Sequence, residues 1–306
     1  MPKWTADDIP DQTGRLAIVT GANSGLGYHV STELARRGAR VILACRDQGR
    51  GQDALDRLLA DAPGADAELR RLDLASLESV REFAAGVDEP LAVLVNNAGV
   101  MAGPHRRTAD GFELQFGTNH LGHFALTGLL LPRLLESQAP RVVTVSSGAH
   151  RMGKMNFDDL QSDAKYWRWG AYGQSKLSNL LFMQELGRRA AAAGVPLVSV
   201  AAHPGYSATN LQTTGHKIDD LFMKVSNVVI AQSDAMGALP LLFAATEDLE
   251  SGAYVGPDGV AEQRGHPKLV GMTGRARSEE DARRLWEKSE ELTGVRYDFS
   301  ARMTAA

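Results

Sequence analysis

Short apolar segments alternate with longer amphipathic segments along most of this chain, and this alternation restricts the fold more than any other feature. The apolar segments are rich in β-branched residues and lie at 16–20, 40–45, 68–74, 91–97, 141–147, 197–203 and 253–256. Helical patterns separate or follow them at about 25–37, 47–60, 76–87, 110–136, 172–193, 231–247 and 279–292. Nearly continuous apolar strands are typical of parallel sheets that are buried on both faces. The pattern therefore predicts βαβ units with right-handed crossovers.

No linker, repeat or change of composition divides the chain. We therefore expect an α/β protein with a single Rossmann-like doubly wound domain, in which helices flank a seven-stranded parallel sheet. Residues 1–13 form an N-terminal lead-in in this interpretation, and residues 14–306 form one dinucleotide-binding catalytic domain. Its C-terminal extension covers about 257–306.

Charge and cysteine content exclude several classes of protein. The 33 Lys and Arg residues against 37 Asp and Glu residues give a net charge of −4, which argues against nucleic acid as the main partner. The single cysteine, Cys45, excludes an intrachain disulfide and a multi-cysteine metal cluster. The N-terminus lacks the apolar segment of a signal peptide, and no apolar run is long enough for a transmembrane helix. We therefore expect a cytoplasmic protein without an integral membrane segment.

A glycine-rich loop, TGANSGLG (20–27), lies directly between the first expected strand and the first expected helix. Glycines in such a loop let the backbone turn tightly and approach a pyrophosphate. The helix that follows offers free N–H groups and the positive end of its dipole. The spacing is G-x-x-x-G-x-G, which differs from the G-x-G-x-x-G of many dinucleotide-binding proteins.

This spacing and the motifs that follow it resemble the short-chain dehydrogenase/reductase family over about residues 14–260. The other motifs occur in the family's order, namely Asp73-Leu74, Asn96-Asn97-Ala98-Gly99, Asn119 in TNHLGHF, Ser147 in VVTVSSGAH, Tyr172 and Lys176 in YGQSK, and Pro204-Gly205 with Thr209 in HPGYSAT. The segments ACRD, NNAGVM, NHLGHF and SSGAH are most similar to the branch that contains retinol dehydrogenases and protochlorophyllide reductase-like proteins.

The resemblance implies a nicotinamide dinucleotide cofactor. The residues that would bind it are Gly21, Asn23, Ser24, Gly25, Leu26, Gly27, Arg46, Asp73, Leu74, Asn97, Ala98, Gly99, Tyr172, Lys176, Pro204, Gly205 and Thr209. Members that prefer NAD carry an acidic residue at the end of the second strand. Here Cys45 takes that position and Arg46 follows, which favours NADP(H) because Arg can pair with a 2′-phosphate in a bidentate way. Asp47 leaves NAD(H) open as the alternative.

The resemblance also implies that Asn119, Ser147, Tyr172 and Lys176 are the catalytic residues. Tyr172 and Lys176 are four residues apart in a helical segment, so they share one face. A free Tyr has a pKa of about 10. The Lys176 ammonium and the positive nicotinamide ring would lower that pKa and make Tyr172 a general acid/base. Ser147 would hydrogen-bond the substrate oxygen, with Ser146 as the competing serine.

We expect no metal site, because the nearby pair His120 and His123 lacks a third ligand at a suitable spacing. The predicted function is an NADP(H)-dependent oxidoreductase that interconverts a lipophilic carbonyl and its alcohol. Reduction of a carbon–carbon double bond and cofactor sensing without turnover are the alternatives. The chain has both Tyr172 and Lys176, which argues against sensing without turnover. A sugar-nucleotide epimerase would have a different glycine spacing.

Two further expectations concern the substrate and the assembly. A substrate lid is expected at about 206–232, facing a wall formed by Met152, Met155 and Trp167 or Trp169 of the insert after Ser147. Such a wall would favour a bulky lipophilic substrate. The long helices at about 110–136 and 172–190 are apolar enough for a core or for a homo-oligomer interface.

Overall fold

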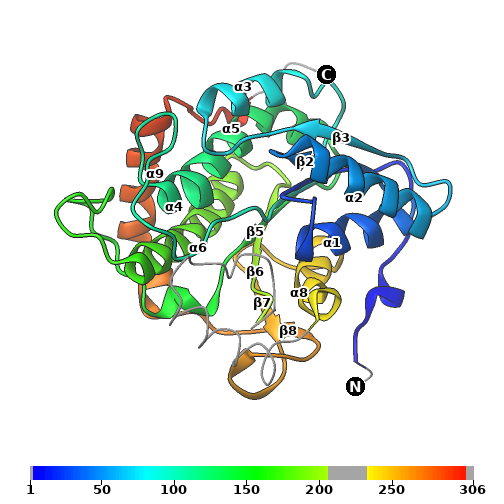
Figure 1. Cartoon of the computed structure of the whole chain (residues 1–306). Helices are drawn as coiled ribbons and strands as arrows, with labels where there is room; N and C mark the ends of the chain where they lie inside the picture. Colours follow the sequence, from blue (N-terminus) through cyan, green and yellow to red (C-terminus); the bar gives the residue numbers. More distant parts are fainter. Residues whose placement is uncertain (1–2, 206–232, 301–306) are drawn as a thin grey trace.

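A computed structural model describes residues 3–205 and 233–300 of the chain (Figure 1). Its central sheet has eight strands in the order β3-β2-β1-β4-β5-β6-β7-β8. The strands are β1 (Leu16–Thr20), β2 (Arg40–Cys45), β3 (Ala67–Arg71), β4 (Val93–Asn96), β5 (Arg141–Val145), β6 (Val198–Ala202), β7 (Tyr254–Pro257) and β8 (Pro267–Leu269). The first seven are parallel, and this confirms the predicted Rossmann-like α/β fold. The eighth strand, β8, was not predicted and pairs antiparallel with β7 at the edge of the sheet.

Helices cover both faces of this sheet. They are α1 (Gly25–Arg36), α2 (Gln48–Asp61), α3 (Leu77–Ala85), α4 (Leu114–Phe116), α5 (Gly122–Glu136), α6 (Arg168–Ala192), α8 (Asp234–Thr246) and α9 (Glu279–Thr293). In Figure 1, α1, α2 and α8 lie on one side of the sheet, and α3, α5 and α6 lie on the other. Both faces of each central strand are therefore buried, which explains why these strands are almost continuously apolar.

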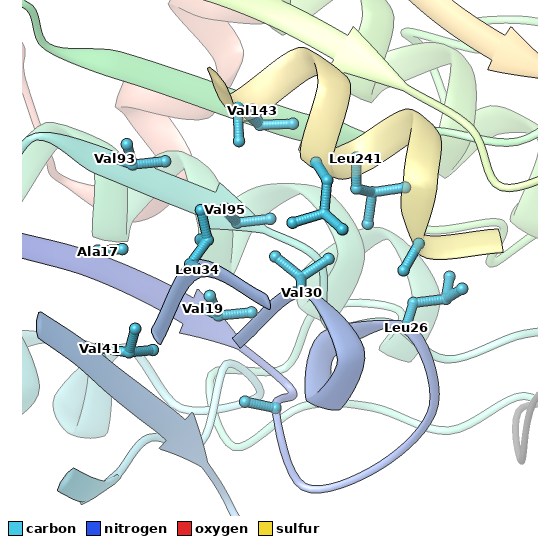
Figure 2. Close-up of a cluster of buried hydrophobic side chains, with 14 of the residues drawn as sticks. Ala17, Val19, Leu26, Val30, Leu34, Val41, Val93, Val95, Val143 and Leu241 are labelled. Atoms are coloured by element: carbon cyan, nitrogen blue, oxygen red, sulfur yellow. The ribbon is translucent and has the colours of Figure 1, made fainter. Parts of the chain in front are cut away.

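Alternate residues of β1 enter two separate core clusters. Val19 packs with Val30 of α1 and Leu241 of α8, as Figure 2 shows. The next residue toward the N-terminus, Ile18, points to the opposite face and joins the cluster that contains Phe124 of α5. This is the two-residue periodicity of a strand with a core on each side.

The segment predicted as one helix over about 110–136 is divided in the structure. The short helix α4 leads into a π-helical turn at Gly117–Leu121, and α5 begins directly after it. Asn119 lies inside this turn and is fully buried. A π-helical turn within a longer helix often marks a functional position, because the extra residue changes the direction of nearby groups.

The C-terminal extension packs against the helices that were expected to meet a second subunit. Trp286 of α9 stacks on Phe182 of α6 with 5.9 Å between ring centres, and it also meets Phe124 of α5 edge to face at 5.1 Å. The hydroxyl of Tyr297 donates to the carbonyl oxygen of Phe124 at 2.6 Å. This part of the apolar face of α5 and α6 is therefore occupied by the chain itself.

The N-terminal segment is also attached to the domain. The Trp4 ring meets Phe243 of α8 edge to face at 5.3 Å, and its Nε1 donates to Glu247 at 2.9 Å. Every helix among residues 3–205 and 233–300 is too short or too polar to cross a bilayer.

Candidate active site

A cavity of about 800 Å³ opens at the carboxyl ends of the parallel strands, where ligands bind in doubly wound folds. Most of the predicted site residues line it. They are Gly21, Asn23, Ser24, Gly25, Leu26, Gly27, Arg46, Asp73, Leu74, Asn97, Ala98, Gly99, Ser147, Tyr172, Lys176, Pro204 and Gly205. Thr209 and the expected lid at 206–232 lie outside the described residues. Asn119 lies behind the wall of the cavity.

The glycine-rich loop has the close backbone packing that a dinucleotide-binding turn needs. Gly21 has a φ of +67°, and a Cβ at this position would lie 3.0 Å from Ala98. A Cβ on Gly27 would lie only 2.6 Å from Asn97 Nδ2. Ser24 begins α1 without a capping bond from its side chain, which leaves N–H groups of the first turn for a ligand. The loop therefore fits the pyrophosphate of a dinucleotide.

Thr20 joins this loop to the strand end that carries the NNAG motif. Its hydroxyl oxygen accepts from the backbone N–H groups of Asn97 and Ala98, each at 2.9 Å. It also lies 2.9 Å from His123 Nε2, and His123 Nδ1 donates to the carbonyl oxygen of Asn119 at 3.0 Å. Since a carbonyl can only accept, Nδ1 carries the ring proton and Nε2 is an acceptor for the Thr20 hydroxyl, whose other acceptor is the Val95 carbonyl oxygen at 3.3 Å. Burial lowers the pKa of His123 to about 4, so the ring stays neutral.

His123 was considered at the sequence level only as a metal ligand beside His120. In the structure the two rings have different partners, because His120 Nε2 lies 2.8 Å from the Ser289 hydroxyl of α9. The residues described contain no group of three His, Cys, Asp or Glu side chains that could hold a metal ion. His123 lies in the same motif as Asn119, but the spacing of that motif does not indicate a bond to the distant Thr20, so the sequence did not indicate this role of His123.

Two arginines line the other end of the cavity. Arg46 follows β2 and is exposed, and Arg50 of α2 lies on the same wall. Asp47 caps α2, since its carboxylate accepts from the Arg50 backbone N–H at 3.0 Å. The same carboxylate lies 3.8 Å from Arg50 Nε. Sequence reasoning missed Arg50 because it follows no family motif that we considered.

Tyr172 and Lys176 project from α6 toward the end of β5. Lys176 Nζ donates to the carbonyl oxygen of Val145 at 3.1 Å and lies 5.7 Å from the centre of the Tyr172 ring. Ser147 follows β5 and lines the cavity together with Tyr172, and its hydroxyl accepts from the Ala149 N–H at 3.2 Å. The hydroxyl of Ser146 instead donates to the backbone carbonyl of Lys176 at 2.9 Å. The geometry therefore favours Ser147 over Ser146 as the serine that faces a substrate.

Burial shifts the pKa values of both groups on α6. It raises the pKa of Tyr172 to about 12, and the hydrogen bond with Ser147 acts in the opposite direction. Burial lowers the pKa of Lys176 to about 8. We expected Lys176 and the nicotinamide ring to lower the pKa of Tyr172. In the protein alone this pKa is raised, because desolvation of the phenolate is the larger effect.

Asn119 stabilises the loop beside these groups. Its side chain accepts from the Val100 N–H at 2.8 Å, and it donates to the Val100 carbonyl oxygen at 2.9 Å and to Ser175 at 3.0 Å. A Cβ on Gly99 would lie 3.1 Å from Asn119 and 3.6 Å from Lys176 Nζ, so the two side chains meet at this glycine. Asn119 therefore fixes the Gly99-Val100 segment of the cavity wall, which lies next to Lys176.

The wall on the substrate side is partly apolar. Met101, Met152 and Trp169 line the cavity, in part as predicted. Met155 instead packs in the core and lies 3.5 Å from the Ser178 hydroxyl, and Trp167 is 58% exposed. Neither of these two residues lines the cavity. The insert after Ser147 therefore turns back against α6 and contributes only part of the expected wall.

Three polar residues of the same wall were missed by the sequence interpretation. Arg151, His203 and Glu262 all line the cavity. They come from three segments that are far apart in the chain. Arg151 and Glu262 belong to no motif that we used, and His203 begins the HPGYSAT motif without a predicted role.

Comparison with known proteins places these features in a family. The sequence pattern described as short chain dehydrogenase matches residues 15–218. Retinol dehydrogenase 12 of Mus musculus is 42% identical over 291 residues, which cover 93% of this chain and 88% of that protein. Retinol dehydrogenase 13 of Homo sapiens is 42% identical over 293 residues, which cover 92% of this chain and 85% of that protein.

Solved structures agree with the sequence relatives. An uncharacterized protein from Mycobacterium paratuberculosis is 46% identical and has a TM-score of 0.83, with 97% of this chain and 100% of that chain covered. A Beutenbergia cavernae protein solved with bound NADP is 25% identical, with a TM-score of 0.60 and coverage of 78% of this chain and 91% of that chain.

Proposed function

Because the chain belongs to the short-chain dehydrogenase family and is an oxidoreductase of its retinol dehydrogenase branch, we propose that it interconverts a lipophilic carbonyl and its alcohol with NADP(H). This proposal rests mainly on the finding that a single cavity has two chemically different ends. Ser147, Tyr172 and Lys176 lie at one end, and Arg46 and Arg50 lie at the other. The glycine-rich loop lies along the same cavity, where it can hold the pyrophosphate.

The proposed mechanism assigns separate tasks to the residues at the chemical end. A bound nicotinamide supplies or accepts the hydride. In the reduction direction, the Ser147 hydroxyl orients the carbonyl oxygen and Tyr172 gives it a proton. Lys176 holds positive charge beside Tyr172, which favours the phenolate that remains. In the oxidation direction, the Tyr172 phenolate takes the proton from the alcohol.

The proposed preference for NADP(H) depends on the two arginines. Arg46 and Arg50 can both reach an anion at this end of the cavity, and α2 begins there with the positive end of its dipole. The rival interpretation uses Asp47 as an NAD signal. That carboxylate is already engaged as the helix cap and by the Arg50 side chain. These contacts support NADP(H) as the preferred cofactor.

The proposed substrate is bulky and lipophilic. Met101, Met152 and Trp169 offer an apolar surface near Ser147 and Tyr172. Burial of ligand surface against such a wall contributes about 25 cal/mol for each Å². The relatives named as retinol dehydrogenases agree with a substrate of this class. The cytoplasmic location and the homo-oligomer expected from the sequence stay predictions.

Two measurements test the proposal. NADPH should bind at least tenfold more tightly than NADH, about 1.4 kcal/mol, and Arg46→Ala should remove most of that difference. Arg283→Ala is the matched control, because Arg283 is exposed on α9 and pairs with Glu287. Equal dissociation constants for the two cofactors would contradict the preference.

The second measurement uses NADPH and a series of aliphatic and ring-containing aldehydes. We expect kcat/KM to rise with chain length or ring number. A flat response, or a preference for short keto acids, would reject the lipophilic pocket and leave the oxidoreductase assignment intact. Formation of the alcohol, rather than a saturated carbonyl from an unsaturated aldehyde, separates carbonyl reduction from double-bond reduction.

A further inference from the structure

Glu262 places a carboxylate in the cavity from the C-terminal extension. It lies in a 3-10 turn (Val260–Glu262) that follows β7, and it lines the cavity together with Ser147 and Tyr172. One carboxylate oxygen lies 3.2 Å from His203 Nε2. The Arg151 guanidinium donates to both carboxylate oxygens, at 3.1 and 3.2 Å. Glu262 therefore joins three segments of the chain around the reacting end.

His203 connects this carboxylate to the turn after β6. The ring is buried, and its Nδ1 accepts from the Gly205 N–H at 3.3 Å. Because Nδ1 accepts, Nε2 carries the proton and donates it to Glu262. Burial lowers the pKa of His203 to about 4, so this contact is a hydrogen bond from a neutral ring to a carboxylate. The turn at Pro204 and Gly205 is part of the cavity wall.

Arg151 connects the same carboxylate to the loop after Ser147. It ends the 3-10 turn Gly148–Arg151, whose first residue follows Ser147 directly. His150 of this turn donates from Nδ1 to the Ser147 carbonyl oxygen at 2.7 Å. A shift of Arg151 would therefore move the backbone to which Ser147 belongs.

The backbone around Glu262 adopts an uncommon conformation, in which the side chain contacts Arg151 and His203. Ala261 and Glu262 both have positive φ, at +52° and +57°, which costs energy for residues other than glycine. Such conformations persist where the surrounding structure enforces them, and they gather at functional sites. Gly256 of β7 also has no space for a Cβ, which would overlap the His203 ring.

We propose that Glu262 is a positioning residue, which acts through Arg151 and His203 to hold the Ser147 loop and the Pro204-Gly205 turn in the geometry that the reaction needs. This proposal rests on the proposed function, because it assigns a task within the same cavity. It assigns a task to a side chain of the C-terminal extension, which also contributes Ala261 and Gln263 to the cavity wall.

Replacement of Glu262 by Gln removes the negative charge and leaves the shape of the side chain nearly unchanged, so it tests the role of the charge. The carboxylate accepts from two donors through two oxygens, whereas an amide offers one accepting oxygen and an N–H₂ group that faces other donors. Oε2 contacts both His203 and Arg151, and Oε1 contacts Arg151 alone, so Glu262→Gln removes the negative charge beside Arg151 and at least one of these three contacts. Glu291→Gln is the matched control, since Glu291 lies in the same extension and pairs with Lys288 at the exposed surface of α9.

We expect Glu262→Gln to lower kcat with a lipophilic aldehyde about tenfold and to shift its melting temperature by no more than about 2 °C, while Glu291→Gln changes neither. Arg151→Gln should lower kcat by a similar factor. The double variant should then be no worse than the poorer single variant, because the two residues act through one contact. A purely structural role would change the melting temperature and leave kcat per folded molecule unaltered, and this outcome would overturn the proposal.

A proton NMR measurement provides a readout that does not depend on turnover. The His203 ring N–H, held by a carboxylate, should give a downfield resonance that disappears in His203→Asn. We expect Glu262→Gln to move or broaden this resonance and to weaken NADPH binding by a measurable factor. If the wild-type protein reduced no carbonyl, the proposed function would fail, but these two readouts would still test Glu262. An unchanged resonance together with unchanged kcat and NADPH affinity would reject the positioning role.

Discussion

Lys176 Nζ lies 5.7 Å from the centre of the Tyr172 ring, and both side chains are almost completely buried on one face of α6. The ammonium has one backbone partner at this point, the carbonyl oxygen of Val145. A cation held in this way is poorly solvated, and it raises the relative stability of negative charge on the neighbouring phenol. The pair therefore places a cation beside the atom that becomes negative when the phenol loses its proton.

Replacement of Tyr172 by Phe should lower kcat by two or more orders of magnitude. The variant removes the group that gives or takes the proton and leaves the shape of the wall nearly unchanged. The dissociation constant for NADPH should stay within about threefold of the wild-type value. Tyr28→Phe is the matched control, because the Tyr28 hydroxyl donates to Asp61 away from the cavity. A Tyr172→Phe enzyme with half of its turnover would contradict the mechanism.

Replacement of Lys176 by Met should abolish turnover and make the protein more stable. Burial lowers the pKa of Lys176 from the usual 10.5 to about 8, which corresponds to a cost of about 3 kcal/mol for its charge at neutral pH. The Val145 carbonyl keeps a second donor, Asn179 Nδ2 at 3.0 Å. We expect a higher melting temperature for the variant, measured without cofactor at pH 7. A lower melting temperature would show that Lys176 stabilises the fold.

The same lysine predicts a pH dependence of stability. Between pH 8 and 10.5 the unfolded chain holds a proton on Lys176 that the folded chain has released. The free energy of unfolding of the wild type should therefore rise with pH across this window, relative to Lys176→Met. The advantage of the variant should be largest below pH 8 and should shrink toward pH 10.5. Urea unfolding of both proteins at four or five pH values measures this difference, and a constant difference would show that the pKa of Lys176 is not lowered in the folded chain.

Arg50→Ala should weaken NADPH binding several-fold and leave NADH binding unchanged. Arg50 lines the cavity beside Arg46, and its side chain is 74% exposed, so its contribution to a phosphate contact is modest. The loss should shrink at high salt because the contact is exposed. Titration of both cofactors at low and high ionic strength checks this. Equal losses for NADPH and NADH would point to damage of α2 instead.

Trp286→Ala should destabilise the fold by about 3–5 kcal/mol. The ring is 1% exposed, it stacks on Phe182, and the Arg189 guanidinium lies over it at 4.6 Å from its centre. Trp167→Ala is the control, since that ring is 58% exposed. Chemical denaturation of both variants should give a large loss only for Trp286. Sedimentation of Trp286→Ala should also reveal self-association if the uncovered face of α5 and α6 then pairs between molecules.

The sequence was sufficient for the parallel part of the sheet because burial on both faces leaves an apolar run, as in β1 and β5. It was insufficient for β8, the edge strand next to β7, whose three residues are mostly exposed. It also missed the π-helical turn at Gly117–Leu121, since apolar periodicity does not distinguish one extra residue in a helix. Tertiary contacts, rather than local preference, determine both features.

The candidate site shows the same division. Ser147, Tyr172 and Lys176 could be found because each lies in a motif with a fixed local spacing. Glu262 could not, because it reaches the cavity through a backbone with positive φ that follows a short strand, and no spacing connects it to Arg151. His123 was missed for a related reason, since its partners Thr20 and Asn119 belong to different motifs.

The C-terminal extension leaves the ribosome after the helices that it covers, and this order has a consequence for synthesis. Domains fold from the N-terminus as the chain emerges. When β1 to β6 can already pair, the aromatic face around Phe124 and Phe182 still lacks Trp286, and the cavity still lacks Glu262. The nascent protein therefore exposes an apolar surface until α9 has emerged. We expect the yield of folded enzyme to depend on how quickly α9 docks after that point.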